Sequence, residues 1–142
     1  MTQLQAIRWF VDYVAGEHVI IPKQREDWQI ALGDTKPRLT LPPDLTAFDD
    51  RDKLFRADFI RRCPLARGFA NVTISILHEL GHHFNRESVI FAEKLEGDTM
   101  EEHIRLPQEI IATDWAIEWL HDSNNRKVAK EFERDFFGYG KS

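Results

Sequence analysis

The clearest chemistry in this chain lies between Ser75 and Phe84, where His78, Glu79 and His82 form an H-E-x-x-H motif. On a helix, residues four apart lie about 40° apart and one turn along the axis, so both imidazoles can reach one metal ion. Glu79, one position further round, can miss the ion and act on water as a general base. The motif therefore predicts half of a zinc site on a helix.

A catalytic zinc site needs a third protein ligand, because two histidines hold the ion poorly. The continuation H-E-x-x-H-x-x-G-x-x-H is excluded, since the chain has Asn85 and Ser88 where that pattern requires glycine and histidine. Glu109, on a later predicted helix, is the leading candidate for the third ligand. Helical phase places it on one uncharged stripe with Ala112 and Ala116, whose small side chains would let this helix approach the motif helix closely.

Other interpretations of these residues stay open at this stage. The two histidines could belong to an ordinary core helix, and Glu109 could be an acid favoured by the first turn of its helix. The fallback metal ligands are Glu93, Glu96, His103 and Asp114. His83, about 100° round the helix from His82, is expected to pack beside the site or to support a ligand. The chain also offers four donors that could stabilise a reaction oxyanion: His83, His103, Tyr13 and Tyr139.

The two segments together resemble the ImmA/IrrE family of zinc metallopeptidases, whose pattern is H-E-L-G-H followed some tens of residues later by E-x-x-A-N-x-F-A. The corresponding stretches here are His78-Glu-Leu-Gly-His82 and Glu109-Ile-Ile-Ala-Thr-Asp-Trp-Ala116, in which Thr113 replaces the family's Asn and Trp115 its Phe. The resemblance covers residues 68–120. It implies a zincin-like domain with zinc held by His78, His82 and Glu109 and with Glu79 as the base. It also implies regulatory proteolysis of a protein or peptide, such as a repressor, in bacteria or phages.

The elements that must position these residues follow from the spacing of apolar side chains, which predicts an α+β fold. Four helices are expected, at residues 3–15, 68–86 (carrying the motif), 107–121 and 125–137. Three β-prone pieces, at residues 18–21, 28–32 and 38–41, predict a small three-stranded sheet. Residues 42–66 are expected to be a solvated connection that can include a short helix, with no chemistry assigned to it, and residues 87–105 an exposed loop. Gly81 is costly inside a helix, by about 1 kcal/mol, unless a neighbouring strand or helix packs closely against it.

The composition limits the remaining function classes. A length of 142 residues suits a single domain spanning 1–142. The net charge of −5 argues against direct nucleic-acid binding or a membrane-surface role. A single cysteine, Cys63, the lack of a signal segment and the lack of a long apolar run predict a cytoplasmic protein. The predicted function is zinc-dependent peptide hydrolysis, and the alternative is a non-catalytic, metal-stabilised protein-interaction module or regulator.

Overall fold

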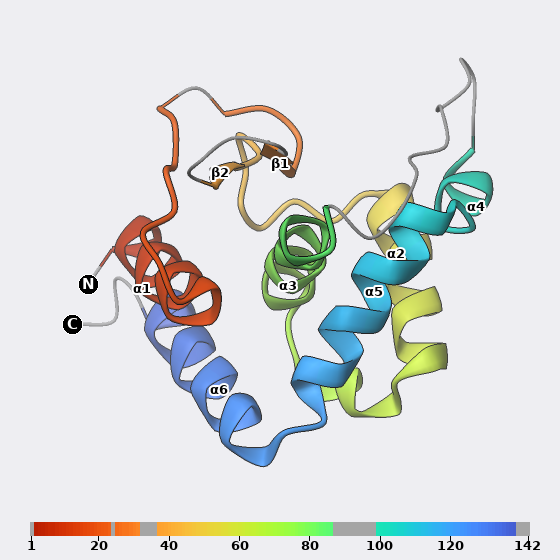
Figure 1. Ribbon diagram of the computed structural model, residues 1–142. Helices are drawn as coiled ribbons and strands as arrows, with labels where there is room; N and C mark the ends of the chain where they lie inside the picture. Colours follow the sequence, from red (N-terminus) through yellow and green to blue (C-terminus); the bar gives the residue numbers. More distant parts are fainter. Residues whose placement is uncertain (1, 24, 32–36, 87–98, 139–142) are drawn as a thin grey trace.

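The computed structural model describes residues 2–23, 25–31, 37–86 and 99–138 (Figure 1). Within these ranges the chain forms six α-helices, one 3-10 helix and a two-stranded antiparallel sheet, in agreement with the predicted α+β class. In chain order the elements are α1 (Gln3–Ala15), β1 (Gln29–Ala31), β2 (Arg38–Thr40), α2 (Asp50–Arg62), η1 (Pro64–Gly68), α3 (Asn71–Phe84), α4 (Met100–His103), α5 (Pro107–Leu120) and α6 (Ser123–Phe137). Across the described helices, none combines the length and the apolar character needed to cross a membrane.

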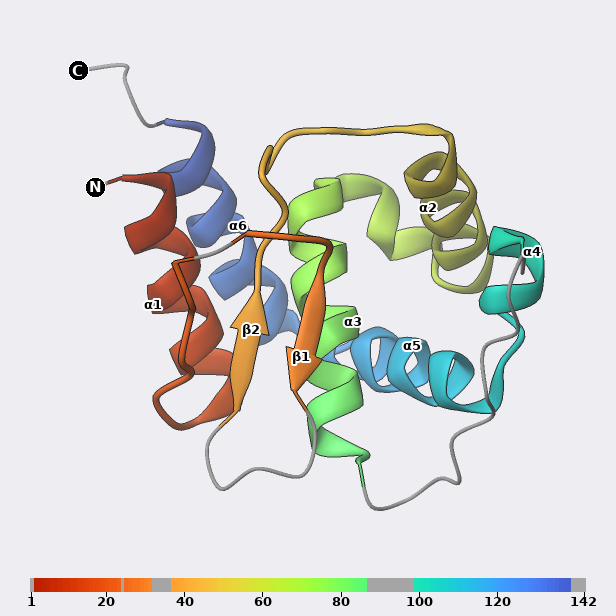
Figure 2. The same cartoon turned by 90° about the horizontal axis from the view of Figure 1, so that it is seen from above.

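Helix α3, which carries the H-E-x-x-H motif, is the central element of the fold. Figure 1 shows it between the α1–α6 pair on one side and α5 on the other, and Figure 2 shows β1 of the sheet lying over it. Ten of its fourteen residues are buried, which explains why a segment with β-branched residues near its start is stable as a helix. On the α1–α6 side, Phe10 stacks on Phe132 with ring centroids 4.5 Å apart. The motif helix is thus held by tertiary packing on several faces.

The first turn of α3 is capped by a side chain from another helix. Ala70, at the N-cap position, has no side chain that can accept a hydrogen bond. Glu133 of α6 accepts instead, from the Ala70 backbone N–H at 2.7 Å and from the Thr73 hydroxyl at 2.6 Å. This carboxylate also suits the positive end of the helix dipole. Helix α6 therefore fixes the start of the motif helix.

Helices α3 and α5 approach each other closely at Gly81. A Cβ built on Gly81 would lie 2.3 Å from the carbonyl oxygen of Ala112, closer than any real contact. The prediction that this glycine admits a neighbouring element is confirmed, and the element is the helix that carries Glu109. Ala112 and Ala116 are fully buried on the facing stripe, as their helical phase indicated.

The prediction of a three-stranded sheet is wrong, because the described residues form a sheet of two strands. β1 and β2 pair in register from Gln29 opposite Thr40 to Ala31 opposite Arg38. The remaining β-prone piece, residues 18–21, runs beside β2 but makes only an isolated parallel bridge from Ile20 to Arg38. Pro22 has no N–H to donate, so the pairing cannot continue along this piece.

The prediction for residues 42–66 is also wrong in its main point, since half of this range is the thirteen-residue helix α2. Its N-terminus is closed by a reciprocal pair, in which the Asp49 side chain accepts from the Asp52 backbone and Asp52 accepts from the Asp49 backbone. Part of the predicted loop 87–105 is helical as well, because Met100–His103 forms α4. Residues 87–98 lie outside the described ranges.

Candidate metal centre

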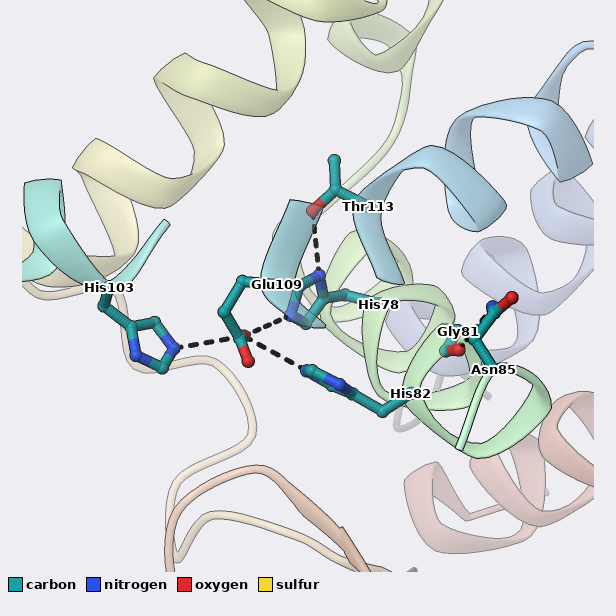
Figure 3. A network of polar contacts seen from close by, with 7 residues as sticks. All are labelled: His78, Gly81, His82, Asn85, His103, Glu109 and Thr113. Carbon is teal, nitrogen blue, oxygen red and sulfur yellow. Dashed lines mark hydrogen bonds and ion pairs between the residues drawn. The ribbon is translucent and has the colours of Figure 1, made fainter. Parts of the chain in front are cut away.

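The three predicted metal ligands come together between α3 and α5. His78 and His82 lie one turn apart on α3, and each directs its Nε2 atom at the carboxylate of Glu109 (Figure 3). The Nε2 atoms lie 3.0 Å and 3.1 Å from Glu109 Oε1, respectively. The ligand atoms of the three residues all lie within 4.8 Å of one another. All three side chains are at least 89% buried, which places the group inside the protein and not on a solvated face.

This arrangement is compatible with a bound metal ion. Two ligand atoms on a tetrahedral zinc ion, each bonded at about 2.1 Å, lie about 3.4 Å apart, so small adjustments of the observed spacing would seat the ion. Two imidazoles and one carboxylate also leave one position free for water or substrate. A structural zinc site would instead use a fourth protein ligand. The donor set therefore fits an open metal site.

Two further side chains fix the orientation of His78. Its Nδ1 atom lies 3.0 Å from the hydroxyl oxygen of Thr113, one turn after Glu109 on α5. The His78 ring also makes an edge-on contact with the ring of Phe55 on α2, and the two ring centroids lie 4.9 Å apart. The Thr113 hydroxyl can accept a proton from Nδ1, and in the tautomer with its proton there Nε2 would have the lone pair that a metal needs.

Glu79 lies on the wall of a cavity of about 610 Å³, a size suited to a peptide segment. His78, Thr113 and Glu109 line the same cavity, so two of the three predicted metal ligands and the predicted base face one common space. Residues of the β1 region, of the segment 42–49 and of α2 complete the wall, including Trp28, Pro42, Asp49, Asp52 and Phe55. Residues 42–66, which were expected to have no chemistry, thus contribute to the wall of the candidate site.

The pKa values of the two carboxyl groups at the site, Glu79 and Glu109, are shifted in opposite directions. Burial raises the pKa of Glu79 well above its ordinary value of 4.5, and the charge of nearby Glu109 raises it further. Burial would also raise the pKa of Glu109, but hydrogen bonds from His103, His78 and His82 outweigh it and hold this pKa far below 4.5. Burial lowers the pKa of His78, despite the opposing effect of Glu109. One carboxylate is therefore suited to hold a cation and the other to exchange a proton.

The other residues named from the sequence fall into distinct places. His103 of α4 lies in the cavity with its Nε2 atom 3.1 Å from Glu109 Oε1. Asp114 is not part of the cluster and pairs with Arg62 of α2. His83 is buried against Phe84 and Arg86, outside the cavity lining. Tyr13 is about half exposed on α1, where it stacks on Trp9. Glu93, Glu96 and Tyr139 lie outside the described ranges.

Sequence reasoning missed the contribution of Phe55. A signal was present, because Phe55 and Phe59 are spaced four residues apart after the Asp49-x-x-Asp52 cap, as on one face of a helix. The role of Thr113 was also open, since this residue stands where the resembled family has Asn. Its hydroxyl contacts the imidazole of His78, which is a support that either side chain type can give.

No family model, curated protein or solved structure matches this chain.

Proposed function

We propose that this protein is a zinc-dependent peptidase with a zincin-like domain. The observation that carries the proposal is the convergence of His78, His82 and Glu109 on one point, beside a cavity that Glu79 also lines. An H-E-x-x-H helix that served only the core would not need a buried carboxylate from a second helix at the same point. The charge of that carboxylate is costly to bury unless it is paired or holds a cation.

Zinc is the metal that this donor set suits best, since imidazole and carboxylate ligands with one open position are typical of hydrolytic zinc sites. A bound zinc ion would supply the Lewis acidity that polarises a peptide carbonyl and makes water a stronger acid. His78 and His82 would hold the ion through Nε2, and Glu109 through its carboxylate. The Thr113 hydroxyl would keep the His78 ring in the ligating orientation.

Glu79 would act as the general base and then as the general acid. A base works best when its pKa lies near the pH of the reaction, and the raised pKa of Glu79 moves it in that direction. In the proposed reaction its carboxylate takes a proton from the attacking water and later delivers it to the leaving amine. The partly exposed position of Glu79 on the cavity wall gives water and a peptide access to it.

The resemblance to the ImmA/IrrE family gives the proposal a biological setting. The matching residues of the second segment, Glu109, Ala112 and Ala116, form the buried stripe of α5 that faces α3. The pattern thus corresponds to a physical requirement, which is close approach of the two helices around a shared ion. We propose regulatory proteolysis of a protein such as a repressor, in the cytoplasm of a bacterium or in a phage context.

The test compares wild-type protein with Glu79→Gln, both loaded with zinc, on a proteome-derived peptide library read by mass spectrometry. Wild type should produce new peptide termini. Glu79→Gln should keep its zinc and lose at least about 10²-fold in cleavage, because a general base contributes about that much or more. Glu118→Gln, an exposed change on α5, is the matched control and should cleave as wild type does.

Equal cleavage by wild type and Glu79→Gln would contradict the proposal. Bound zinc with no cleavage in either protein would favour the non-catalytic metal-stabilised module.

A further inference from the structure

His103 is the one histidine of the cavity that the H-E-x-x-H motif does not account for. It ends α4, and the turn of residues 104–106 joins it to α5. Its Nε2 atom lies 3.1 Å from Glu109 Oε1, and 26% of its side chain is exposed. Helix α4 packs against α2, so the position of His103 is set by elements other than the motif helix.

His103 approaches Glu109 from the opposite side to the motif histidines. Figure 3 shows the carboxylate between His103 on one side and His78 and His82 on the other. The group whose ligand atoms all lie within 4.8 Å of one another contains His78, His82 and Glu109, and it does not include His103. An ion shared by those three residues would therefore have His103 behind the carboxylate and not beside the ion.

His103 differs from His78 and His82 in whether it can donate a hydrogen bond to Glu109 once a metal ion is bound. Three Nε2 atoms lie within 3.1 Å of the same carboxylate oxygen. A histidine that holds a metal through Nε2 uses the lone pair there and has no Nε2 proton to donate. His78 and His82 would lose these hydrogen bonds to Glu109 on binding an ion, whereas His103 would keep its own.

The other ring nitrogen of His103 agrees with this assignment. Its Nδ1 atom is buried and has no hydrogen-bond partner in the described part of the chain. A buried N–H without a partner is rarer in proteins than a buried acceptor without one. The proton therefore belongs on Nε2, where Glu109 accepts it.

We propose that His103 is a positioning residue for the metal centre, which donates its Nε2 proton to Glu109 and fixes the direction of that carboxylate toward the ion. The inference rests on the metal site of the proposed function but not on peptide cleavage. It also connects the metal centre to α4 and, through α4, to α2.

The test measures zinc affinity by competition with a chromophoric chelator, in wild type, His103→Leu and His103→Gln. His103→Leu removes the donor and should weaken zinc binding about 10- to 100-fold, as loss of a residue that supports a ligand does. His103→Gln places an amide N–H near the position of Nε2 and should recover most of the affinity. A purely structural role would not distinguish the two variants in this way, and circular dichroism verifies that both are folded.

X-ray absorption at the zinc edge then separates positioning from direct ligation. We expect two imidazole ligands in wild type and two in His103→Gln. Three imidazoles in wild type would overturn the proposal, as would unchanged affinity in His103→Leu. Long-range ¹H–¹⁵N NMR of wild type gives an independent check, because a proton on Nδ1 of His103 would also overturn it. Absence of peptidase activity with these affinity differences intact would contradict only the proposed reaction, whereas a wild type that binds no zinc would overturn both.

Discussion

Replacement of Gly81 by alanine should damage the metal centre through the backbone of α5. The added Cβ would lie 2.3 Å from the Ala112 carbonyl oxygen and 3.0 Å from its carbonyl carbon and Cα. Ordinary contact begins at 3.4 Å, so the two helices must separate locally by about 1 Å. These atoms belong to a helix backbone, which cannot rotate away as a flexible side chain could.

Two opposing terms set the effect on stability. Overpacking costs about 1–3 kcal/mol, whereas alanine is about 1 kcal/mol better than glycine inside a helix. The free energy of unfolding of the metal-free protein should therefore fall by at most about 2 kcal/mol. Metal binding should suffer more, because α5 carries Glu109 and a site tolerates misplacement of only about 0.5 Å. A tenfold loss of zinc affinity, the least we expect, removes about 1.4 kcal/mol of the stabilisation that zinc gives.

The assay combines zinc competition with denaturant unfolding, each with and without zinc. Gly68→Ala is the matched control, since its added Cβ would meet only the flexible end of Lys130, at 3.6 Å. The decisive result is a loss of stability in Gly81→Ala that is larger with zinc than without it. If Gly81→Ala and Gly68→Ala have the same zinc affinity and the same stability, the close approach of α3 and α5 does not position Glu109.

Three further predictions concern single side chains. Thr113→Val keeps the shape of the side chain but removes the hydroxyl next to His78, so zinc affinity should fall about tenfold or more. Thr113→Ser keeps the hydroxyl and should retain the affinity. Equal zinc affinities of the two variants, measured by chelator competition, would contradict this. Glu133→Ala removes the acceptor that caps α3 and should lower the free energy of unfolding by about 1–3 kcal/mol, against no more than about 0.5 kcal/mol for exposed Glu131→Ala. The raised pKa of Glu79 means that the folded protein keeps this proton at a pH where the unfolded chain has released it. Metal-free wild type should therefore lose stability relative to Glu79→Gln as the pH rises above about 4.5, and a difference that is the same at pH 4.5 and pH 8 would argue against burial of this carboxyl.

The cluster of His78, His82 and Glu109 could be predicted from the sequence because its residues follow helical geometry. His78 and His82 are spaced by one turn, and Glu109 stands on a stripe that includes Ala112. The contact between α3 and α5 spans about thirty residues of chain, yet small residues on both sides indicated it. The backbones of Gly81 and Ala112 lie close together, which their small side chains allow.

The elements that surround the ligands were harder to predict, since local patterns do not determine their packing. Helix α2 has only one fully buried residue, Phe59, and its acidic start has the composition of a solvated connection. Its place depends on contacts such as that of Phe55 with His78, which no sequence spacing shows. The extra strand was predicted from β-propensity alone, and β-propensity depends strongly on the partners that a segment finds.

The role of His103 was beyond sequence reasoning for a related reason. It lies six residues before Glu109 but on a separate helix, so helical phase does not relate the two side chains. Only the turn of residues 104–106 and the packing of α4 on α2 bring its ring to the carboxylate.

The metal centre is tested most directly by the zinc content of purified protein after dialysis, measured by mass spectrometry, in wild type, Glu109→Ala and Glu118→Ala. Glu118 lies on the same helix but is exposed, so its replacement controls for a general effect on α5. We expect one zinc ion per chain in wild type and Glu118→Ala, and strong depletion in Glu109→Ala. Full zinc retention in Glu109→Ala, or no zinc in wild type, would contradict this expectation.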